Sequence, residues 1–205
     1  MTGLVHGTTP YPWPYDEGLA RDRTALVVLG WNDTWWDRCQ APDHVVATID
    51  RLAAAVALVV VVDQPQPSRT RPARHDSCGL PGQHVRPVNG AVTVSAAGID
   101  GFYGGPLDAV LRAAGCDLLL LAGLGLETTV HSTMRSANDR GYECLLVIDA
   151  CASSDTGLVP AAISMVEMSG GIFGAVGDSD AVLVALHHAD ADRPTNATRD
   201  HGCNP

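Results

Sequence analysis

The stretch GLGLETTVHSTMRSANDRGYECLLVIDACA, residues 123–152, combines the end of an apolar strand, a tight turn, a helix and a second strand. The helix opens on Glu127, Thr128 and Thr129, directly after glycines that permit a sharp turn. Many α/β enzymes present a nucleophile on such an elbow between strand and helix. Here the turn carries Thr129 where a cysteine or serine nucleophile would stand. The stretch therefore predicts an α/β fold and raises the question of whether the elbow is still an active site.

Apolar runs of strand length alternate with amphipathic helical patterns along the rest of the chain. Continuous apolar runs such as TALVVLG are typical of strands that are buried on both faces. The expected strands are 24–30, 58–63, 91–94, 117–123, 143–150 and 172–176, and the expected helices are 43–57, 106–115, 128–141, 158–171 and 178–188. This alternation predicts a three-layer αβα domain with a central, mainly parallel sheet.

The chain has 205 residues, of which 46% are apolar, which is enough for one well-buried domain but not for two. Residues 1–23 are rich in proline and aromatic residues, so we expect an extended N-terminal arm. Residues 24–188 form the single expected domain, and the polar residues 189–205 are expected to be a disordered tail. The segment 64–89, rich in proline, arginine and glycine, is expected to be a long loop of the kind that forms a lid or a pocket wall.

The charge of the chain excludes two classes of partner. Its formal net charge is −10, so we expect it to bind neither nucleic acid nor anionic membranes.

The sequence shows no export signal and no apolar run of membrane-spanning length, which predicts a cytoplasmic protein. Its six cysteines form no C-x-x-C pair and are expected to be free thiols. All 13 basic residues are arginine, and lysine is absent.

Four motifs carry a family resemblance. They are YPWPYDEGLARDRTALVVLGWND, GFYGGPLDAVLRAAG, LLLLAGLGLETTVHSTMRSANDRGYECLLVIDACAS and GGIFGAV, in this order along the chain. Together they resemble the isochorismatase-like cysteine hydrolases, and most of all the branch of biuret hydrolases and ureidoacrylate amidohydrolases. The resemblance extends over residues 11–186 and implies the same αβα fold.

Amide hydrolases of that family resemble one another in a catalytic triad. It comprises an aspartate at the end of the first strand, a lysine before the FY segment and a cysteine at the helix opening. A thiolate at a helix N-terminus has a lowered pKa and nearby N–H groups for an oxyanion, and the carboxylate accepts the thiol proton. The resemblance maps the three positions onto Leu29, Ala96 and Thr129. It therefore implies that the covalent amidase mechanism is absent.

Two other branches of the family fit the sequence less well. The branch that cleaves the vinyl ether of isochorismate lacks the cysteine but keeps the aspartate, which is Leu29 here. Nicotinamidase-like relatives hold a metal with a D-x-H…H pattern after the second strand. In this chain the corresponding metal site would combine Asp63, His75 and His84, at spacings that depart from the pattern. We expect no metal and no other cofactor.

Three polar residues near the predicted strand ends are candidates for acid–base catalysis: Asp33, Glu127 and His131. Each also has a structural explanation. Asp33 could bond backbone after the first strand, Glu127 suits the first turn of a helix, and His131 could be a packing residue. Thr129 lacks a neighbouring base, so we expect it to be a helix cap that accepts a backbone N–H rather than a nucleophile.

The stretch WNDTWW follows the first strand and places Trp31, Trp35 and Trp36 within six residues. They either pack in the core or a subunit interface, or form an aromatic wall for an apolar or flat ligand. The other residues expected around the pocket are Asp100, Phe102, Tyr103, Leu124, Gly125 and Thr128. Because the triad positions have lost charge, we expect the pocket to be less polar and roomier than in the relatives.

Two hypotheses of different class follow. In the first, the pocket has been repurposed for a larger, less polar small molecule, with non-covalent acid–base or shape catalysis by Asp33, Glu127, Asp100 or His131. In the second, the protein is a catalytically inactive pseudoenzyme that serves as a ligand-binding or structural subunit, beside an active paralogue. Ordinary amide hydrolysis is a third and less favoured hypothesis. The resemblance further implies a homodimer or homotetramer.

Overall fold

The two strands with unbroken apolar sequences lie at the centre of the sheet. Every residue of β1 (Thr24–Leu29) and of β4 (Leu118–Leu124) is buried, as expected for strands that helices cover on both faces. The computed structural model describes residues 19–40, 42–64 and 84–191. In it, β1 and β4 run in parallel, with Val27 opposite Leu121.

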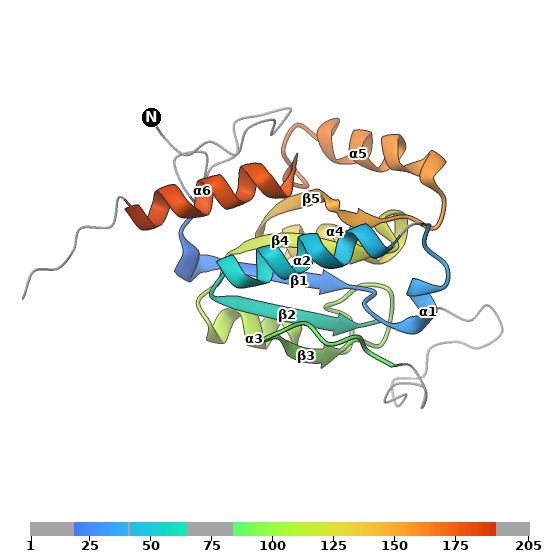
Figure 1. Cartoon of the computed structure of the whole chain (residues 1–205), viewed down its shortest axis with the longest axis horizontal. Helices are drawn as coiled ribbons and strands as arrows, with labels where there is room; N and C mark the ends of the chain where they lie inside the picture. The colour runs from blue at the N-terminus through green and yellow to red at the C-terminus, as the bar shows by residue number, and fades with distance from the viewer. Residues whose placement is uncertain (1–18, 41, 65–83, 192–205) are drawn as a thin grey trace, which may run out of the picture.

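Four further strands complete the sheet on both sides of this central pair. They are β2 (Leu58–Asp63), β3 (Val92–Ser95), β5 (Glu143–Ala152) and β6 (Ala175–Gly177). The order across the sheet is β3-β2-β1-β4-β5-β6, and each of these neighbouring pairs is parallel (Figure 1). The predicted αβα architecture with a parallel sheet is confirmed.

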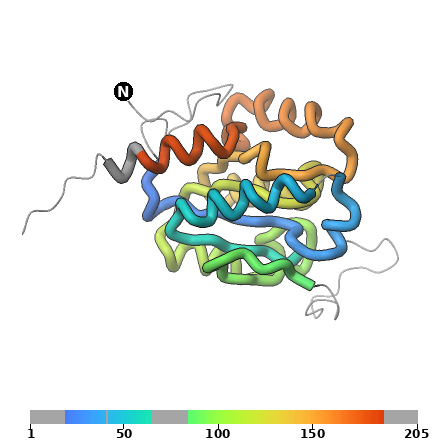
Figure 2. The backbone as a smooth tube through the Cα atoms, viewed as in Figure 1, coloured from blue at the N-terminus to red at the C-terminus, as the bar shows by residue number. Residues whose placement is uncertain are grey.

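Helices cover both faces of the sheet because alternate strand residues point to opposite sides. The first face packs against α2 (Asp43–Ala55) and α6 (Ser179–Ala191), and α2 crosses in front of the strands in Figure 2. The second face packs against α3 (Leu107–Ala113), α4 (His131–Asp139) and α5 (Val159–Glu167). Among the described residues, no helix has the length and apolarity needed to span a membrane.

Several short elements were not expected from the sequence. They are η1 (Arg21–Arg23), α1 (Asp33–Trp36) and η3 (Thr156–Leu158). The predicted elbow helix is divided, because η2 (Leu126–Val130) is a π-helical turn that precedes α4. At the other end of the domain, α6 continues to Ala191, past the predicted boundary at 188.

Parts of the predicted arm, loop and tail fall on residues 1–18, 65–83 and 192–205, which lie outside the described residues.

Candidate functional site

The elbow lies where the order of the strands reverses. Strands β1 and β4 are neighbours in the sheet, although β2 and β3 come between them in sequence. In parallel sheets, ligands commonly bind beyond the carboxyl ends of the strands at such a switch point. Leu29 ends β1, Ala96 follows β3 and Thr129 follows β4. All three are buried, with exposed fractions of 0%, 7% and 0%.

The hydroxyl of Thr129 bonds to its own turn. Its Oγ1 lies within hydrogen-bonding distance of the carbonyl oxygens of Leu124 and Gly125, and the distance to the latter is 3.1 Å. Because carbonyl oxygens only accept, the hydroxyl is the donor. The prediction that Thr129 caps the helix by accepting a backbone N–H is therefore wrong. Among the described residues, no side chain contacts this hydroxyl as a base would.

The residue at the end of β1 that faces Thr129 is Gly30 rather than Leu29. A Cβ atom placed on Gly30 would lie 3.2 Å from Thr129 Oγ1. The side chain of Leu29 instead reaches the space beside Gly101 and Thr133. Gly30 approaches Thr129 because it leaves the strand in the left-handed conformation, with φ +62°. Neither Gly30 nor Leu29 supplies a carboxylate beside Thr129, and the mapping of the former aspartate position onto Leu29 stays a prediction.

The side chain of Gln64 fills the space between these strand ends. Gln64 follows β2 directly and is fully buried. Its Oε1 accepts from the backbone N–H of Gly30 at 2.8 Å, and its Nε2 donates to Ile99 O at 2.5 Å and to Thr133 Oγ1 at 3.2 Å. The amide thus joins β1, the loop after β3 and α4. Sequence reasoning missed Gln64, and its position directly after a buried strand was the only signal.

Trp35 belongs to the same packed region. It is 4% exposed, and its Nε1 donates to the carbonyl oxygen of Gln64 at 3.2 Å. The buried Asn32 donates to the same oxygen and to Asp63 Oδ1, at 3.1 and 2.8 Å. The buried polar groups of Gln64, Asn32 and Trp35 are therefore satisfied internally. Neither of the two hollows described below is lined by Leu29, Ala96 or Thr129, and the roomier pocket around them stays a prediction.

The elbow itself is held by close contacts. Gly125 has φ +71°, and a Cβ there would lie 2.7 Å from Thr128 Oγ1 and 2.9 Å from the ring of Trp35. The backbone N–H of Gly125 donates to Cys39 Sγ at 3.2 Å. Burial raises the pKa of Cys39 to about 11, so this thiol is protonated at neutral pH. Leu124, which was also expected at the pocket, is fully buried.

The loop residues expected at the pocket have structural contacts of their own. Asp100 Oδ1 accepts from the backbone N–H of Phe102 at 2.9 Å and thereby closes its own turn. The ring of Phe102 stacks on Tyr142, with 5.7 Å between the ring centroids. Tyr103 is 41% exposed. These contacts give Asp100 a role in the turn, and its catalytic role stays a prediction.

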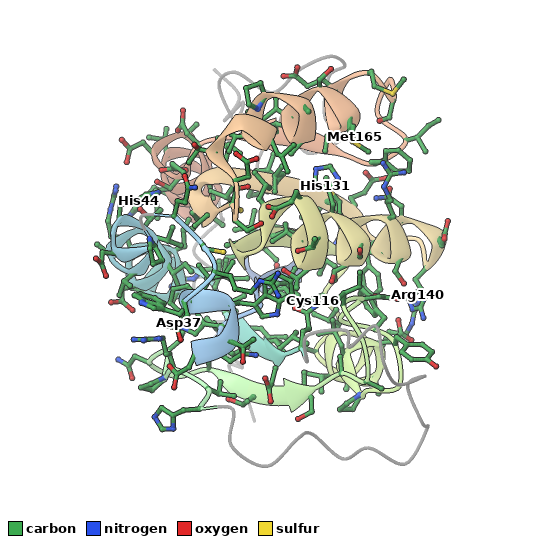
Figure 3. The ribbon with its side chains drawn as sticks, turned by 90° about the vertical axis from the view of Figure 1, so that its right-hand side faces the viewer. Asp37, His44, Cys116, His131, Arg140 and Met165 are labelled. Atoms are coloured by element: carbon green, nitrogen blue, oxygen red, sulfur yellow. The ribbon has the colours of Figure 1, made fainter. Side chains whose placement is uncertain are left out.

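The three catalytic candidates are divided between two hollows. Glu127 and His131 line a hollow of about 240 Å³ between α4 and α5, together with Ser132 and Arg135. Asp33 lines a second hollow, of about 290 Å³. In Figure 3, His131 lies on the side of α4 that faces α5, the helix that carries Met165.

Glu127 is fixed by two serines. Its carboxylate accepts from Ser153 Oγ at 2.7 Å, from Ser154 N at 3.1 Å and from Ser154 Oγ. Burial alone would raise the pKa of Glu127, but the hydrogen bonds from Ser154 and Ser153 outweigh it, so the pKa lies below its usual value. Glu127 is therefore ionised at neutral pH and anchors the loop after β5.

The imidazole of His131 is uncharged at neutral pH, because its pKa lies below the usual value for histidine. Burial lowers its pKa, and the positive charge of Arg135 adds to this effect, against the hydrogen bond with the carbonyl of Ala162. The distance from Nε2 to that carbonyl oxygen is 2.9 Å, so Nε2 donates and Nδ1 carries the lone pair. His131 thus has the protonation state that a general base requires.

The structure does not bring the described residues of the metal site considered from sequence, Asp63 and His84, into a group of metal ligands. Asp63 bonds Asn32, His84 lines the hollow that contains Asp33, and His75 lies outside the described residues. Within ranges 19–40, 42–64 and 84–191, no three His, Cys, Asp or Glu side chains are grouped as metal ligands would be.

Known proteins resemble the chain in sequence and in fold. A family model described as "Isochorismatase domain" matches residues 24–180. A ureidoacrylate amidohydrolase RutB of Methylorubrum extorquens is 26% identical over 193 residues, which cover 92% of this chain and 75% of the relative. RutB of Methylobacterium radiotolerans is 33% identical over 103 residues, which cover 50% of this chain and 39% of the relative.

Among solved structures, a cysteine hydrolase from Pseudomonas syringae pv. phaseolicola superimposes with a TM-score of 0.71 at 21% identity, covering 88% of this chain and 100% of the other. N-carbamoylsarcosine amidase from Thermoplasma acidophilum gives a TM-score of 0.59 at 26% identity, covering 77% of this chain and 97% of the other.

Proposed function

Because the chain belongs to the isochorismatase family, we propose that it is a member that binds a small molecule and does not hydrolyse amides through a covalent intermediate. This corresponds to the second hypothesis from the sequence, a protein that retains the fold and the elbow without the cysteine chemistry. Its relatives named as ureidoacrylate amidohydrolases are the reference for the activity that we expect to be missing.

The observation that carries this proposal is the packing around Thr129. The hydroxyl of Thr129 bonds backbone carbonyls, and the amide of Gln64 occupies the space between the strand ends. A covalent mechanism needs a nucleophile beside a base, with room for a substrate carbonyl. The family resemblance maps the base and the cation onto Leu29 and Ala96, and neither side chain carries a charge.

The experiment is to measure ammonia release from ureidoacrylate, biuret and nicotinamide. We expect no release above a protein-free control, from either the wild type or Thr129→Cys, because a cysteine at 129 would have no carboxylate beside it. A RutB enzyme assayed on ureidoacrylate serves as the positive control. Release by the wild type at a rate comparable to that control would overturn the proposal.

A second candidate function is non-covalent acid–base catalysis in the hollow between α4 and α5. The observation that favours it is that an ionised carboxylate, Glu127, and a neutral imidazole, His131, line the same hollow. Arg135 also lines it and could bind an anionic substrate group.

Hydrolysis of p-nitrophenyl acetate tests this second candidate. A general base with a lowered pKa should keep its activity below about pH 6.5, the usual pKa of histidine, and lose it only as the pH falls further. We expect a wild-type rate about tenfold or more above that of His131→Gln, since a positioned base contributes at least this much. Equal rates for the two proteins would eliminate this candidate.

A further inference from the structure

The hollow that contains Asp33 is built by a short antiparallel pairing. It is lined by Trp31, Asp33, Trp36, Val46, His84, Arg86 and Pro87, and we call it the tryptophan hollow. Its volume of about 290 Å³ is close to the lower limit for ligand pockets, about 300 Å³. The hollow is separate from the space that Gln64 fills, since neither Gln64 nor Thr129 lines it.

Backbone hydrogen bonds fix the walls of the tryptophan hollow. Asp33 N donates to His84 O at 3.2 Å, and Arg86 N donates to Trp31 O at 3.1 Å, on either side of a bridge between Asn32 and Val85. Side chains alternate along such a pair, which places every second residue on the same face. The hollow is accordingly lined by Trp31 and Asp33 from one segment and by His84 and Arg86 from the other. Asn32, which lies between the first two, turns inward to Asp63.

Two residues that line this hollow each carry a buried hydrogen-bond donor without an acceptor. Among the described residues, the buried side-chain nitrogen and oxygen atoms without a partner are Trp31 Nε1 and Arg86 Nε. Trp31 is 2% exposed. Leaving a buried donor unpaired destabilises the folded protein, because the donor loses its hydrogen bonds to water and gains none in return. Two such donors in residues that line one hollow indicate an acceptor that comes from outside the chain.

The surroundings of these donors favour a planar, negatively charged acceptor. The guanidinium carbon of Arg86 lies 3.7 Å from the ring centroid of Trp36, and Trp31 packs edge-on against Trp36 at 5.7 Å. Arg86 also pairs with Asp33, but at 3.4 Å and with both side chains more than a third exposed. Such a pair is weak, so a ligand carboxylate can compete with Asp33.

We infer that the tryptophan hollow binds a small aromatic carboxylate, with its carboxylate on Trp31 Nε1 and Arg86 Nε and its ring beside Trp36. The inference rests on the proposed function and names the class of small molecule. It also departs from the sequence-based expectation of a less polar ligand, because the hollow holds a guanidinium group.

Isothermal titration calorimetry with benzoate tests the inference, and benzamide is the neutral probe of the same shape. We expect benzoate to bind about fivefold or more tightly than benzamide, since hydrogen bonds to charged groups are stronger than those to neutral groups. Trp31→Phe removes one donor and keeps a ring, and should weaken benzoate binding about three- to tenfold. Arg86→Lys keeps the charge, loses Nε and should weaken binding by a similar factor.

Asp33→Asn distinguishes a carboxylate ligand from any other acceptor. Removing this competing negative charge should strengthen benzoate binding about two- to fivefold and leave benzamide binding unchanged. Arg38→Gln is the matched control, because Arg38 lies 5.7 Å over the ring of Trp35, outside the hollow. It should change neither affinity.

The inference is overturned if benzoate does not bind the wild type, if it binds no better than benzamide, or if Trp31→Phe and Arg86→Lys, shown to be folded by circular dichroism, bind it with unchanged affinity. Each of these outcomes is independent of ammonia release, which tests the proposed function by itself.

Discussion

Replacing Gly30 with alanine is expected to lower the free energy of unfolding by about 3 kcal/mol or more. Gly30 has φ +62°, a conformation that costs an L-residue about 1–2 kcal/mol. The added Cβ would also lie 2.5 Å from the carbonyl oxygen of Leu124, which belongs to the backbone of β4 and has little room to move. For a domain of this length, the melting temperature should fall by about 6–12 °C.

Gly115→Ala is the matched control for this substitution. Gly115 also has a positive φ, +71°, but nothing lies within 4 Å of an added Cβ. It should therefore report the conformational cost alone, about 1–2 kcal/mol. Thermal and urea unfolding of both variants would measure the difference. If the two substitutions cost the same, the close approach of Gly30 to Leu124 does not contribute.

This result would bear on function, because an aspartate at position 30 carries the same Cβ as an alanine. A carboxylate at position 30 would therefore require the end of β1 to move away from β4. Placing an acid there needs a backbone change as well as a new side chain, which is consistent with the proposal that this elbow no longer performs amide hydrolysis.

The fold could be predicted because its signals are local. The apolar runs that form β1 and β4 and the apolar stripe of α2 are each contained within a few turns or one strand. The short helix α1 was missed because four residues carry no periodicity. Its start depends on Asn32, whose Oδ1 accepts from Trp35 N at 3.2 Å.

The site was harder to predict because its contacts are distant in sequence. The pairing with residues 84–86 decides which tryptophans of WNDTWW face a hollow, and it places Trp31 beside Arg86. The separation of Asp33 from Glu127 and His131 likewise depends on helix packing. The approach of Gly30 to Thr129 was equally hard to predict, because a glycine in the left-handed conformation changes the direction of the chain after β1.

Replacing Gln64 with methionine should have the second large effect, a loss of about 2–5 kcal/mol in the free energy of unfolding. Methionine has a similar length and flexibility, so the cavity term is small. The loss comes from hydrogen bonds: Gly30 N loses its acceptor, and Ile99 O loses its donor. Each buried group left unpaired costs about 1–3 kcal/mol.

Urea unfolding would measure this loss, and Gln40→Met is the control, since Gln40 is exposed and should change stability by about 0.5 kcal/mol or less. Equal stability of the two variants would contradict the role of Gln64 as the group that closes the strand ends. Benzoate binding provides an independent comparison, because Gln64 does not line the tryptophan hollow. Folded Gln64→Met should retain the wild-type affinity, whereas a loss of binding would indicate that the two regions are coupled through Asn32 and Trp35, which both donate to the Gln64 carbonyl.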